Sequence, residues 1–249
     1  MRNSEGKFLA EGRRVVLEAL ASEASIDRLF LRDDVALDDI RRAADDRQVE
    51  IIDASDAVVR AVSTTTTPQG CVAVVDMPAT DVTALPSRVT LGLLLAGVAD
   101  PGNAGTLLRS GAGAGCDCVL ATRSSVDLFN PKTVRASAGT LFRTPLVSGV
   151  SLSQAAAALH DRGCTLVGAD ARAPVSCYDM DFVPDVCFVL GNEAHGLADA
   201  GSSLDAYARL PLPGGIESLN VAVAGSLLLF EAVRQRLPRN AGLSSPLND

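Results

Sequence analysis

Apolar residues in the first part of the chain recur at intervals that switch between helical and strand periods. Val15, Val16, Ala19 and Leu20 share one helical face, whereas the segment from Ile26 onward alternates as a strand does. We expect helices over residues 13–22, 36–47 and 55–62, and strands over residues 26–31, 49–52 and 71–75. This order predicts a small α/β domain over residues 1–76.

The second part of the chain repeats this alternation on a larger scale. Residues 91–98 form a continuous apolar run, which is typical of a strand buried on both faces of a parallel sheet. We expect further strands over residues 119–121, 141–147, 165–169, 186–190 and 208–212, and helices over residues 103–113, 152–162 and 219–236. This pattern predicts a mostly parallel sheet with helices on both faces. Pro78 and Pro86 indicate a linker over residues 77–88, which leaves residues 89–249 as the second domain.

The composition is that of an ordinary soluble globular protein. Of its 249 residues, 47% are hydrophobic and 21% are charged. The longest apolar run, residues 221–230, is well short of the roughly 20 residues that a membrane span needs. The first six residues are polar and lead into no apolar signal region, so we expect a cytoplasmic protein without membrane contact.

Six cysteines do not form a recognisable metal-binding pattern. Most lie in or beside apolar runs, where a reduced cysteine packs like a small hydrophobic residue. Cys116 and Cys118 have no second pair at zinc-site spacing, and His160 and His195 lie far away in the sequence. We therefore expect buried thiols and no metal site.

The charge distribution is uneven. The net charge is −8, whereas nucleic-acid binding normally leaves a basic footprint. Residues 1–76 carry ten basic and fifteen acidic residues, but residues 101–150 have a net charge of +3. The basic stretch indicates either a local RNA contact or a chance cluster of surface arginines.

Three glycine-containing polar loops follow predicted strands. They begin at Asp100, Gly191 and Pro213, and the last one leads directly into the closing helix. Ligands of open α/β sheets bind beyond the carboxyl ends of the strands, and glycines let a ligand approach the backbone closely. Ser218 stands where a helix N-cap is expected. Each residue alone suits a turn or a cap, but three such loops together predict one ligand pocket.

Familiar nucleotide and protease motifs do not fit the chain. The glycines of residues 111–115 follow a predicted helix, whereas a dinucleotide-binding fingerprint must follow a strand. No phosphate-binding GxxxxGK[ST] loop occurs, and Glu193 and His195 lack the spacing of a zinc protease.

The three loops and their surroundings resemble the SpoU family of RNA 2′-O-ribose methyltransferases, within the SPOUT superfamily. Residues 100–109 and 129–139 resemble the first motif and its continuation, residues 190–197 the second, and residues 210–221 with the following helix the third. The resemblance covers roughly residues 90–236. The first part of the chain is similar to the family's small, ribosomal-protein-like RNA-binding domain.

The resemblance implies a C-terminal trefoil knot, a homodimer and S-adenosylmethionine (SAM) as cofactor. Composition and periodicity cannot indicate a knot, because threaded folds are exceptional. The implied catalytic residues are Asn103, Arg109, Glu193, Ser218 and Asn220. The implied SAM-binding residues are Ala169, Leu190, Gly191, Asn192, Gly196, Leu210, Leu212, Ser218 and Leu219.

Structured RNA is the expected substrate. The candidate RNA-binding residues are Thr66, Gln69, Arg109, Arg123, Lys132 and Arg135. The threonine-rich loop of residues 64–70 could meet RNA, although such loops are usually only solvated turns. The two-domain form favours ribosomal RNA, in particular 23S RNA, over transfer RNA. A non-catalytic RNA-binding or assembly factor, and a methyltransferase acting on a small molecule or a protein, remain as alternatives.

Overall fold

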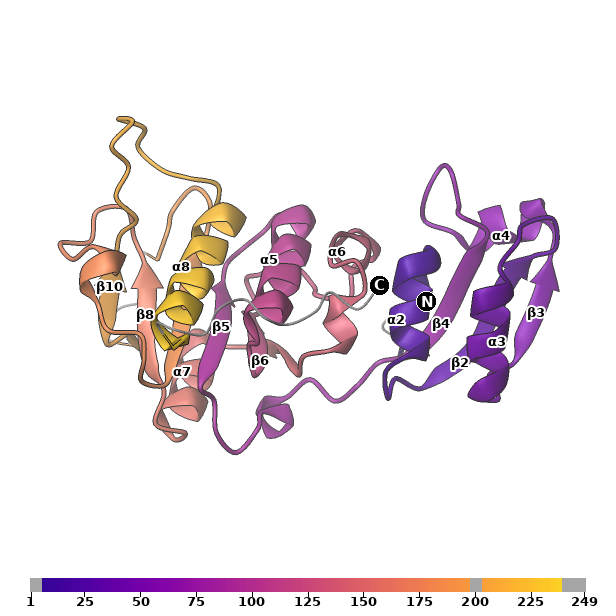
Figure 1. Cartoon of the computed structure of the whole chain (residues 1–249), viewed down its shortest axis with the longest axis horizontal. Coiled ribbons are helices and arrows are strands. Elements are labelled where there is room, and N and C mark those ends of the chain that lie inside the picture. Colours follow the sequence, from indigo (N-terminus) through magenta and orange to yellow (C-terminus); the bar gives the residue numbers. More distant parts are fainter. Residues whose placement is uncertain (1–5, 198–202, 239–249) are drawn as a thin grey trace.

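The computed structural model describes residues 6–197 and 203–238. Two sheets lie side by side along the long axis of the molecule, and residues 77–90 connect them along one side (Figure 1). This segment contains one short 3-10 turn, Val82–Ala84. The chain is therefore an elongated α/β protein with two sheets.

The N-terminal sheet has four strands in the order β1-β4-β2-β3. Its strands are β1 (Lys7–Glu11), β2 (Ile26–Arg32), β3 (Ile51–Ala54) and β4 (Cys71–Asp76). Strand β4 pairs antiparallel with β1 and β2, whereas β2 and β3 are parallel. Three helices, α2 (Arg13–Leu20), α3 (Asp38–Asp46) and α4 (Asp56–Val62), connect the strands.

The C-terminal sheet has six parallel strands in the order β10-β8-β9-β5-β6-β7. The strands are β5 (Leu91–Ala96), β6 (Cys118–Thr122), β7 (Leu146–Val150), β8 (Thr165–Ala169), β9 (Val186–Gly191) and β10 (Ala206–Ala208). Strands β5 and β9 are central and almost completely buried, as their continuous apolar sequences require. This arrangement confirms the predicted parallel sheet.

Helices cover both faces of this sheet. On one face, Leu93 and Leu95 of β5 belong to the same core cluster as Leu107 of α5 (Pro101–Ala114) and Leu228 of α8 (Val221–Arg236). On the other face, residues of α7 (Leu152–His160) join a second cluster that includes Leu94. The alternating side chains of one strand thus anchor two helical layers.

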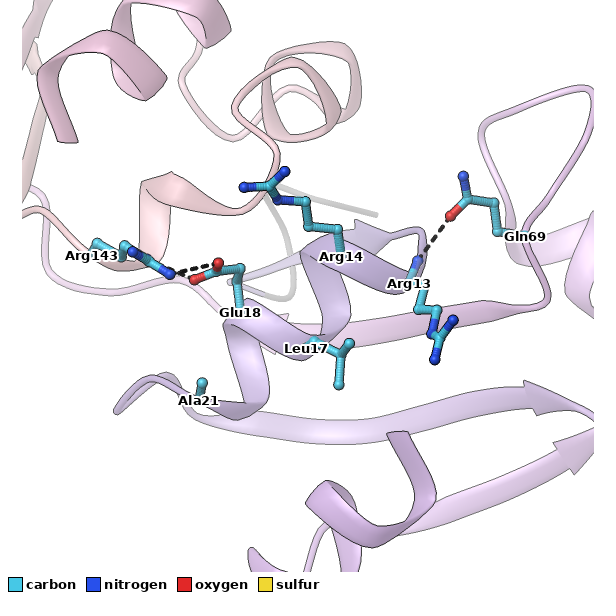
Figure 2. Close-up of a pocket in the computed structure, with 7 residues that line it drawn as sticks. All are labelled: Arg13, Arg14, Leu17, Glu18, Ala21, Gln69 and Arg143. Carbon is cyan, nitrogen blue, oxygen red and sulfur yellow. Dashed lines mark hydrogen bonds and ion pairs between the residues drawn. The ribbon is translucent and has the colours of Figure 1, made fainter. Parts of the chain in front are cut away.

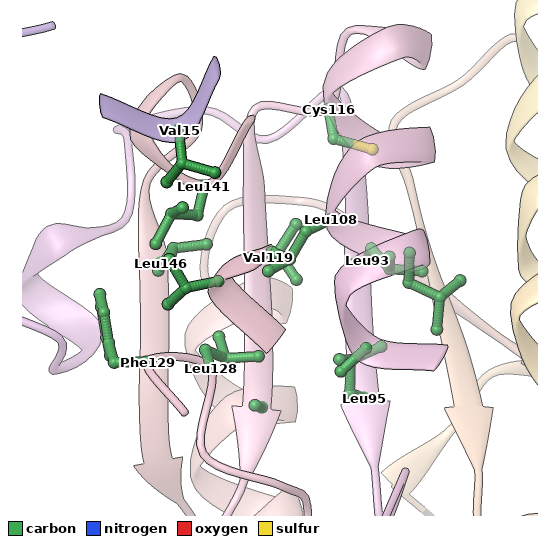
Figure 3. Packing of buried hydrophobic residues seen from close by; sticks show 14 of the residues in the cluster. Val15, Leu93, Leu95, Leu108, Cys116, Val119, Leu128, Phe129, Leu141 and Leu146 are labelled. Atoms are coloured by element: carbon green, nitrogen blue, oxygen red, sulfur yellow. The ribbon is translucent and has the colours of Figure 1, made fainter. Parts of the chain in front are cut away.

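The two sheets share a hydrophobic core. Phe8 of β1 lies 4.9 Å from Phe129 between ring centroids, and Val15 of α2 packs beside Leu141 and Leu146 (Figure 3). A short helix, α6 (Pro131–Ala136), contacts both β1 and α5. The position of the N-terminal sheet is therefore fixed by packing as well as by the connecting segment.

Four local expectations were wrong or incomplete. Residues 141–147 are not one strand, because a 3-10 turn (Thr140–Phe142) precedes β7. The strand expected over residues 208–212 lies earlier, at β10, where Ala208 pairs with Ala169. Strand β1 and helix α6 were not predicted as separate elements, because each contains at most two large apolar residues and gives no clear periodic signal.

The cysteines lie in the core, as expected. All six are free and buried. Burial raises the pKa of Cys71, Cys116 and Cys164 to about 12, so these thiols stay protonated. Within the described part of the chain, no helix is long and apolar enough to span a membrane. The same residues contain no cluster of three or more metal-binding side chains.

Candidate functional site

The loops after β5 and β9 meet at the carboxyl edge of the parallel sheet. Strands β5 and β9 are neighbours, with Ala96 opposite Gly191, so the loops that leave them start side by side. Asp100 caps helix α5, since its Oδ1 accepts a hydrogen bond of 2.8 Å from the backbone N–H of Asn103. The cap and Pro101 begin the helix at a defined residue, which fixes Asn103 in the first turn.

Asn103, Glu193 and Asn220 form a continuous hydrogen-bonded cluster, called here the polar triad. Asn103 Nδ2 donates to Glu193 Oε1 at 3.0 Å, and Asn220 Nδ2 donates to Asn103 Oδ1 at 2.9 Å. Asn103 and Asn220 lie at the starts of helices α5 and α8, 117 positions apart in the sequence, and Glu193 lies in the loop after β9. The structure therefore brings together three of the five predicted catalytic residues.

Glu193 remains ionised within the triad. Partial burial raises the pKa of this carboxyl group, but the Asn103 amide and the backbone N–H groups of Ala99 and Asp100 lower it more. The net pKa is below the ordinary value of 4.5. A charged acceptor at this point orients the Asn103 amide and closes the loop after β5 onto the loop after β9.

The loop that follows β9 is tightly constrained. Asn192 and Gly196 exchange two backbone hydrogen bonds, and Asn192 Oδ1 accepts from the N–H groups of Ala194 and His195. Asn192 Nδ2 also donates to the carbonyl of Gly97 at 3.0 Å. A Cβ atom on Gly191 would overlap the carbonyl group of Gly196. Gly191 is thus required for this fold of the loop, and the Asn192 side chain holds it in place.

The candidate cofactor residues surround three adjacent strand ends. Ala169 ends β8, Leu190 and Gly191 end β9, and Leu210 follows β10 by two residues. Leu212 and Leu219 are half-buried in the segment that leads into α8. Small and apolar residues at strand ends leave room for an adenine ring, and backbone N–H and C=O groups of the loops that follow can bond the polar groups of the adenosine and methionine parts. The residues present fit SAM.

Ser218 does not cap the last helix. The N-cap of α8 is Asn220, whose Oδ1 accepts hydrogen bonds from the N–H groups of Ala222 and Val223. The expectation that Ser218 caps α8 was therefore wrong. Both residues are good caps, but the helix begins two residues later than the sequence pattern indicates. Ser218 lies in an exposed segment, residues 213–218, ahead of the helix.

Arg109 lies away from the polar triad. It follows Asn103 by six positions on α5, which turns it about 240° around the helix axis, onto the outward face. Among the described residues, none forms an ion pair or hydrogen bond with its guanidinium group. Its charge is therefore available to a ligand or to another chain.

One cavity borders the site region, and another lies beside the N-terminal sheet. One, of about 450 Å³, lies between the loop after β9 and the ends of β5, β6 and β7, and its lining includes Gly97, Arg123, Asn192, His195 and Gly196. The other, of about 490 Å³, lies beside α2 (Figure 2). Neither is lined by Ala169, Leu210 or Leu219.

Comparison with known proteins identifies the family. Residues 90–230 match the SpoU rRNA Methylase family. The chain belongs to the SpoU rRNA methylase family. Residues 1–73 match the MRM3-like substrate binding domain. Together these matches extend over both sheets.

Curated relatives of this SpoU chain are named as ribosomal RNA methyltransferases. It is 36% identical over 177 residues to a 23S rRNA (uridine(2479)-2′-O)-methyltransferase of Streptomyces viridochromogenes, a match that covers 68% of this chain and 62% of the relative. It is 30% identical over 242 residues to the 23S rRNA (guanosine-2′-O-)-methyltransferase RlmB of Ralstonia nicotianae, covering 94% and 97%. The chain thus spans less than two thirds of the first relative and almost all of the second.

Solved SpoU structures share the whole architecture. The SpoU methyltransferase AviRb of Streptomyces viridochromogenes, in complex with the cofactor AdoMet, superposes with a TM-score of 0.86 at 30% identity. The superposition covers 94% of this chain and 92% of AviRb. AdoMet is another abbreviation for SAM, so a protein of this fold holds the predicted cofactor.

The predicted RNA-binding residues of this SpoU chain differ in their contacts. Thr66 is exposed, and Gln69 accepts a hydrogen bond from the Arg13 N–H. Lys132 Nζ lies 3.7 Å from Asp100, and Arg123 Nε donates to the Gly149 carbonyl at 2.7 Å. Arg135 instead contacts the N-terminal domain. Its partners are Thr64 of the threonine-rich loop and Glu11, to which sequence analysis assigned no role.

Proposed function

We propose that this chain transfers the methyl group of SAM to a ribose 2′-hydroxyl of 23S ribosomal RNA. The polar triad carries this proposal, because it joins all three motif segments at the edge of the sheet where ligands bind. The names of the curated relatives support the reaction and the RNA. The AdoMet complex of AviRb supports the cofactor.

The cofactor would be held by the ends of β8, β9 and β10. Ala169, Leu190, Gly191 and Leu210 would provide backbone contacts, and the remaining candidates, Asn192, Gly196, Leu212, Ser218 and Leu219, would close over it. SAM supplies an activated methyl group, so the protein needs to align the acceptor rather than create a strong electrophile. Alignment of reacting groups contributes up to ~7–11 kcal/mol.

Arg109 would orient the RNA at the reacting ribose. Its exposed guanidinium group suits a phosphate of the target nucleotide, because it presents several N–H donors in a fixed plane. A guanidinium with a pKa above ~12 is a poor proton acceptor, so we assign it orientation and electrostatic stabilisation of the hydroxyl. Asn103, Glu193 and Asn220 would fix the pocket wall, and Ser218 would secure the segment ahead of α8.

The division of labour follows the two sheets. Residues 1–76 would bind RNA, residues 77–88 would link the domains, and residues 89–249 would bind SAM and hold the catalytic residues. We also propose that the C-terminal segment forms the trefoil knot of the SPOUT superfamily. Thr66, Gln69, Arg123 and Lys132 would contact the RNA directly, in the cytoplasm.

A homodimer would complete the site. Val223, Leu227 and Phe230 lie on one outward stripe of α8, and each side chain is about half exposed, at 47%, 45% and 50%. Helix α5, which carries the exposed Arg109, packs beside α8. A second copy of the chain would bury this stripe and bring its own α5 against the site.

Methyl transfer from tritiated SAM to deproteinised RNA tests this function. Label is expected in 23S RNA, and digestion to nucleosides should place it on a 2′-O-methylated nucleoside. Label in transfer RNA alone would show that transfer RNA, and not 23S RNA, is the substrate. SAM binding without transfer to any RNA would favour a non-catalytic factor, and label in protein would contradict the assignment to RNA.

A further inference from the structure

A buried carboxylate in the N-terminal domain contacts three hydroxyl groups of one loop. Glu11 is 4% exposed, and its oxygens accept hydrogen bonds from the hydroxyls of Ser63, Thr64 and Thr65 and from the Thr64 N–H. Burial raises the pKa of Glu11, but these donors outweigh it and hold the pKa below the ordinary value of 4.5. A buried charge therefore fixes the first half of the threonine-rich loop.

Arg135 joins this carboxylate from the other domain. Its Nη1 lies 3.5 Å from Glu11 Oε2 and also donates to the Thr64 hydroxyl. Arg135 lies on α6, and α6 lies tightly against α5, since a Cβ atom on Gly105 would overlap the Ala136 side chain. Contacts thus run without a gap from the loop, through α6, to the helix that carries Asn103.

The tip of the loop presents two exposed threonine side chains. Thr66 and Thr67 are exposed, and the Thr66 carbonyl accepts a hydrogen bond from Arg60. The loop rises on the same side of the molecule as the segment that leads into α8 (Figure 1). Residues 63–65, which are bonded to Glu11, therefore hold the exposed Thr66 and Thr67 on the side of the proposed active site.

We infer that Glu11 and Arg135 are positioning residues for RNA, which hold the 63–67 loop at a fixed place relative to helix α5. Glu11, Thr64 and Arg135 are called here the interdomain latch. The inference rests on the proposed function, because it assigns the loop to the same RNA substrate. A pre-ordered loop pays less conformational entropy on binding, so the latch acts on RNA affinity rather than on the transfer step.

A second ion pair between the domains provides the control. Arg143 Nε and Nη2 both donate to Glu18 at 2.7 Å across the same boundary (Figure 2). Arg143 is 62% exposed and has no contact with the 63–67 loop in the described structure. Arg135→Gln and Arg143→Gln therefore each remove one interdomain ion pair, and only Arg135→Gln releases the loop.

Steady-state methylation of an RNA substrate separates the two variants. Arg135→Gln should raise KM for RNA about tenfold, with kcat and the Kd for SAM within about twofold of wild type. Arg143→Gln should leave all three within about twofold. Thr64→Val, a conservative change on the exposed loop, should raise KM about threefold, and the double variant Thr64→Val/Arg135→Gln should be no worse than Arg135→Gln alone. Equal effects of Arg135→Gln and Arg143→Gln would overturn the inference.

The salt dependence of KM distinguishes the latch from direct RNA contact by Arg135. Removal of a phosphate contact lowers the slope of log KM against log salt concentration by roughly 0.7–0.9. The latch requires an unchanged slope for Arg135→Gln. A reduced slope, with no effect of Thr64→Val, would make Arg135 a phosphate contact and refute the positioning role.

Hydrogen exchange tests the latch independently of activity. Peptides over residues 63–70 should exchange faster in Arg135→Gln than in wild type or Arg143→Gln. An inactive wild-type protein would defeat the proposed function but leave this result interpretable. Unchanged exchange in Arg135→Gln, or faster exchange without a change in KM, would contradict the inference.

Discussion

The polar triad and Arg109 show two different states of preparation within one candidate site. Asn103, Glu193 and Asn220 are already bonded to one another in a single chain. Arg109, on the same helix as Asn103, is exposed and points elsewhere. The difference shows that a single chain is enough to order the polar triad. Arg109, which would contact RNA, has no such partner in the described chain and would be ordered by a ligand or by a second copy.

The largest expected effect comes from removing Arg109, the exposed member of this comparison. Arg109→Ala should reduce methyl transfer by at least about 100-fold, because groups positioned for proton transfer or charge stabilisation contribute ~10²–10⁴ in rate. SAM binding, measured by calorimetry, should stay within about threefold of wild type. Arg88→Ala, which removes an exposed arginine paired with Asp185 at the other end of β5, serves as the control. Wild-type activity of Arg109→Ala would remove this residue from the mechanism.

The next effect tests whether a second copy completes the site. Leu227→Glu places a charge in the apolar stripe of α8, where burial against a second copy leaves it unpaired at a cost of several kcal/mol. We expect a monomer in light scattering and a loss of transfer of about tenfold or more. Val58→Glu, at a 44% exposed position on α4, adds the same charge elsewhere and should leave the mass in light scattering unchanged. A fully active Leu227→Glu monomer would show that one chain suffices.

A substitution in the loop after β9 tests whether SAM binds at this strand end. In Gly191→Ala the new methyl group would overlap the Gly196 carbonyl, so the loop must move away from the strand end. The Kd for SAM should rise about tenfold, which corresponds to about 1.4 kcal/mol. Gly111→Ala meets only ordinary contacts in α5 and should leave binding unchanged. Equal affinity of the Gly191→Ala protein for SAM would place the cofactor elsewhere.

Asn220 allows capping to be separated from its bond to Asn103. Asn220→Asp keeps an oxygen that can accept from the first N–H groups of α8, but it loses the amide that donates to Asn103. We expect a Tm within about 4 °C of wild type and an activity about fivefold lower, since one hydrogen bond contributes about 1 kcal/mol. A large fall in Tm with unchanged kcat would assign Asn220 to the helix alone.

The smallest effect concerns the protonation of Glu193. Its pKa is lowered in the folded protein, so its contribution to stability is complete above about pH 4.5 and is lost as the pH falls through the folded value. Because the side chain is exposed, this contribution should be about 1 kcal/mol or less. Denaturant unfolding of wild type and Glu193→Gln between pH 6 and pH 3, roughly the range over which carboxylates titrate, should show a shallower fall for the variant. If the free energy of unfolding fell equally with pH in both proteins, ionisation of Glu193 would contribute nothing to stability.

Long periodic segments made most of the fold predictable. Strand β5 and helix α8 are continuous and apolar enough to identify from sequence, and β8 was predicted with its observed bounds. Short elements were missed or misplaced where periodicity is weak, as in α6 and β10. The start of α8 was misassigned because Ser218 and Asn220 compete for the same capping role.

Most residues of the candidate site could be named from the sequence, but not all of their contacts. The spacing of the loops after strands indicated that Asn103 and Glu193 lie near each other, and the structure joins them directly. Sequence could not show that Arg135 faces Glu11, because that contact depends on how the two sheets pack against each other. The periodicity of a short segment contains no information about the packing between two sheets.

Nucleoside analysis of RNA methylated by the pure protein tests the central claim most directly. After incubation with SAM and 23S RNA, digestion and mass spectrometry should reveal one nucleoside whose added methyl group stays on the ribose fragment. The Arg109→Ala protein should yield none of it under the same conditions. A methyl group on the base, or no methylated nucleoside from a protein that binds SAM, would contradict the account.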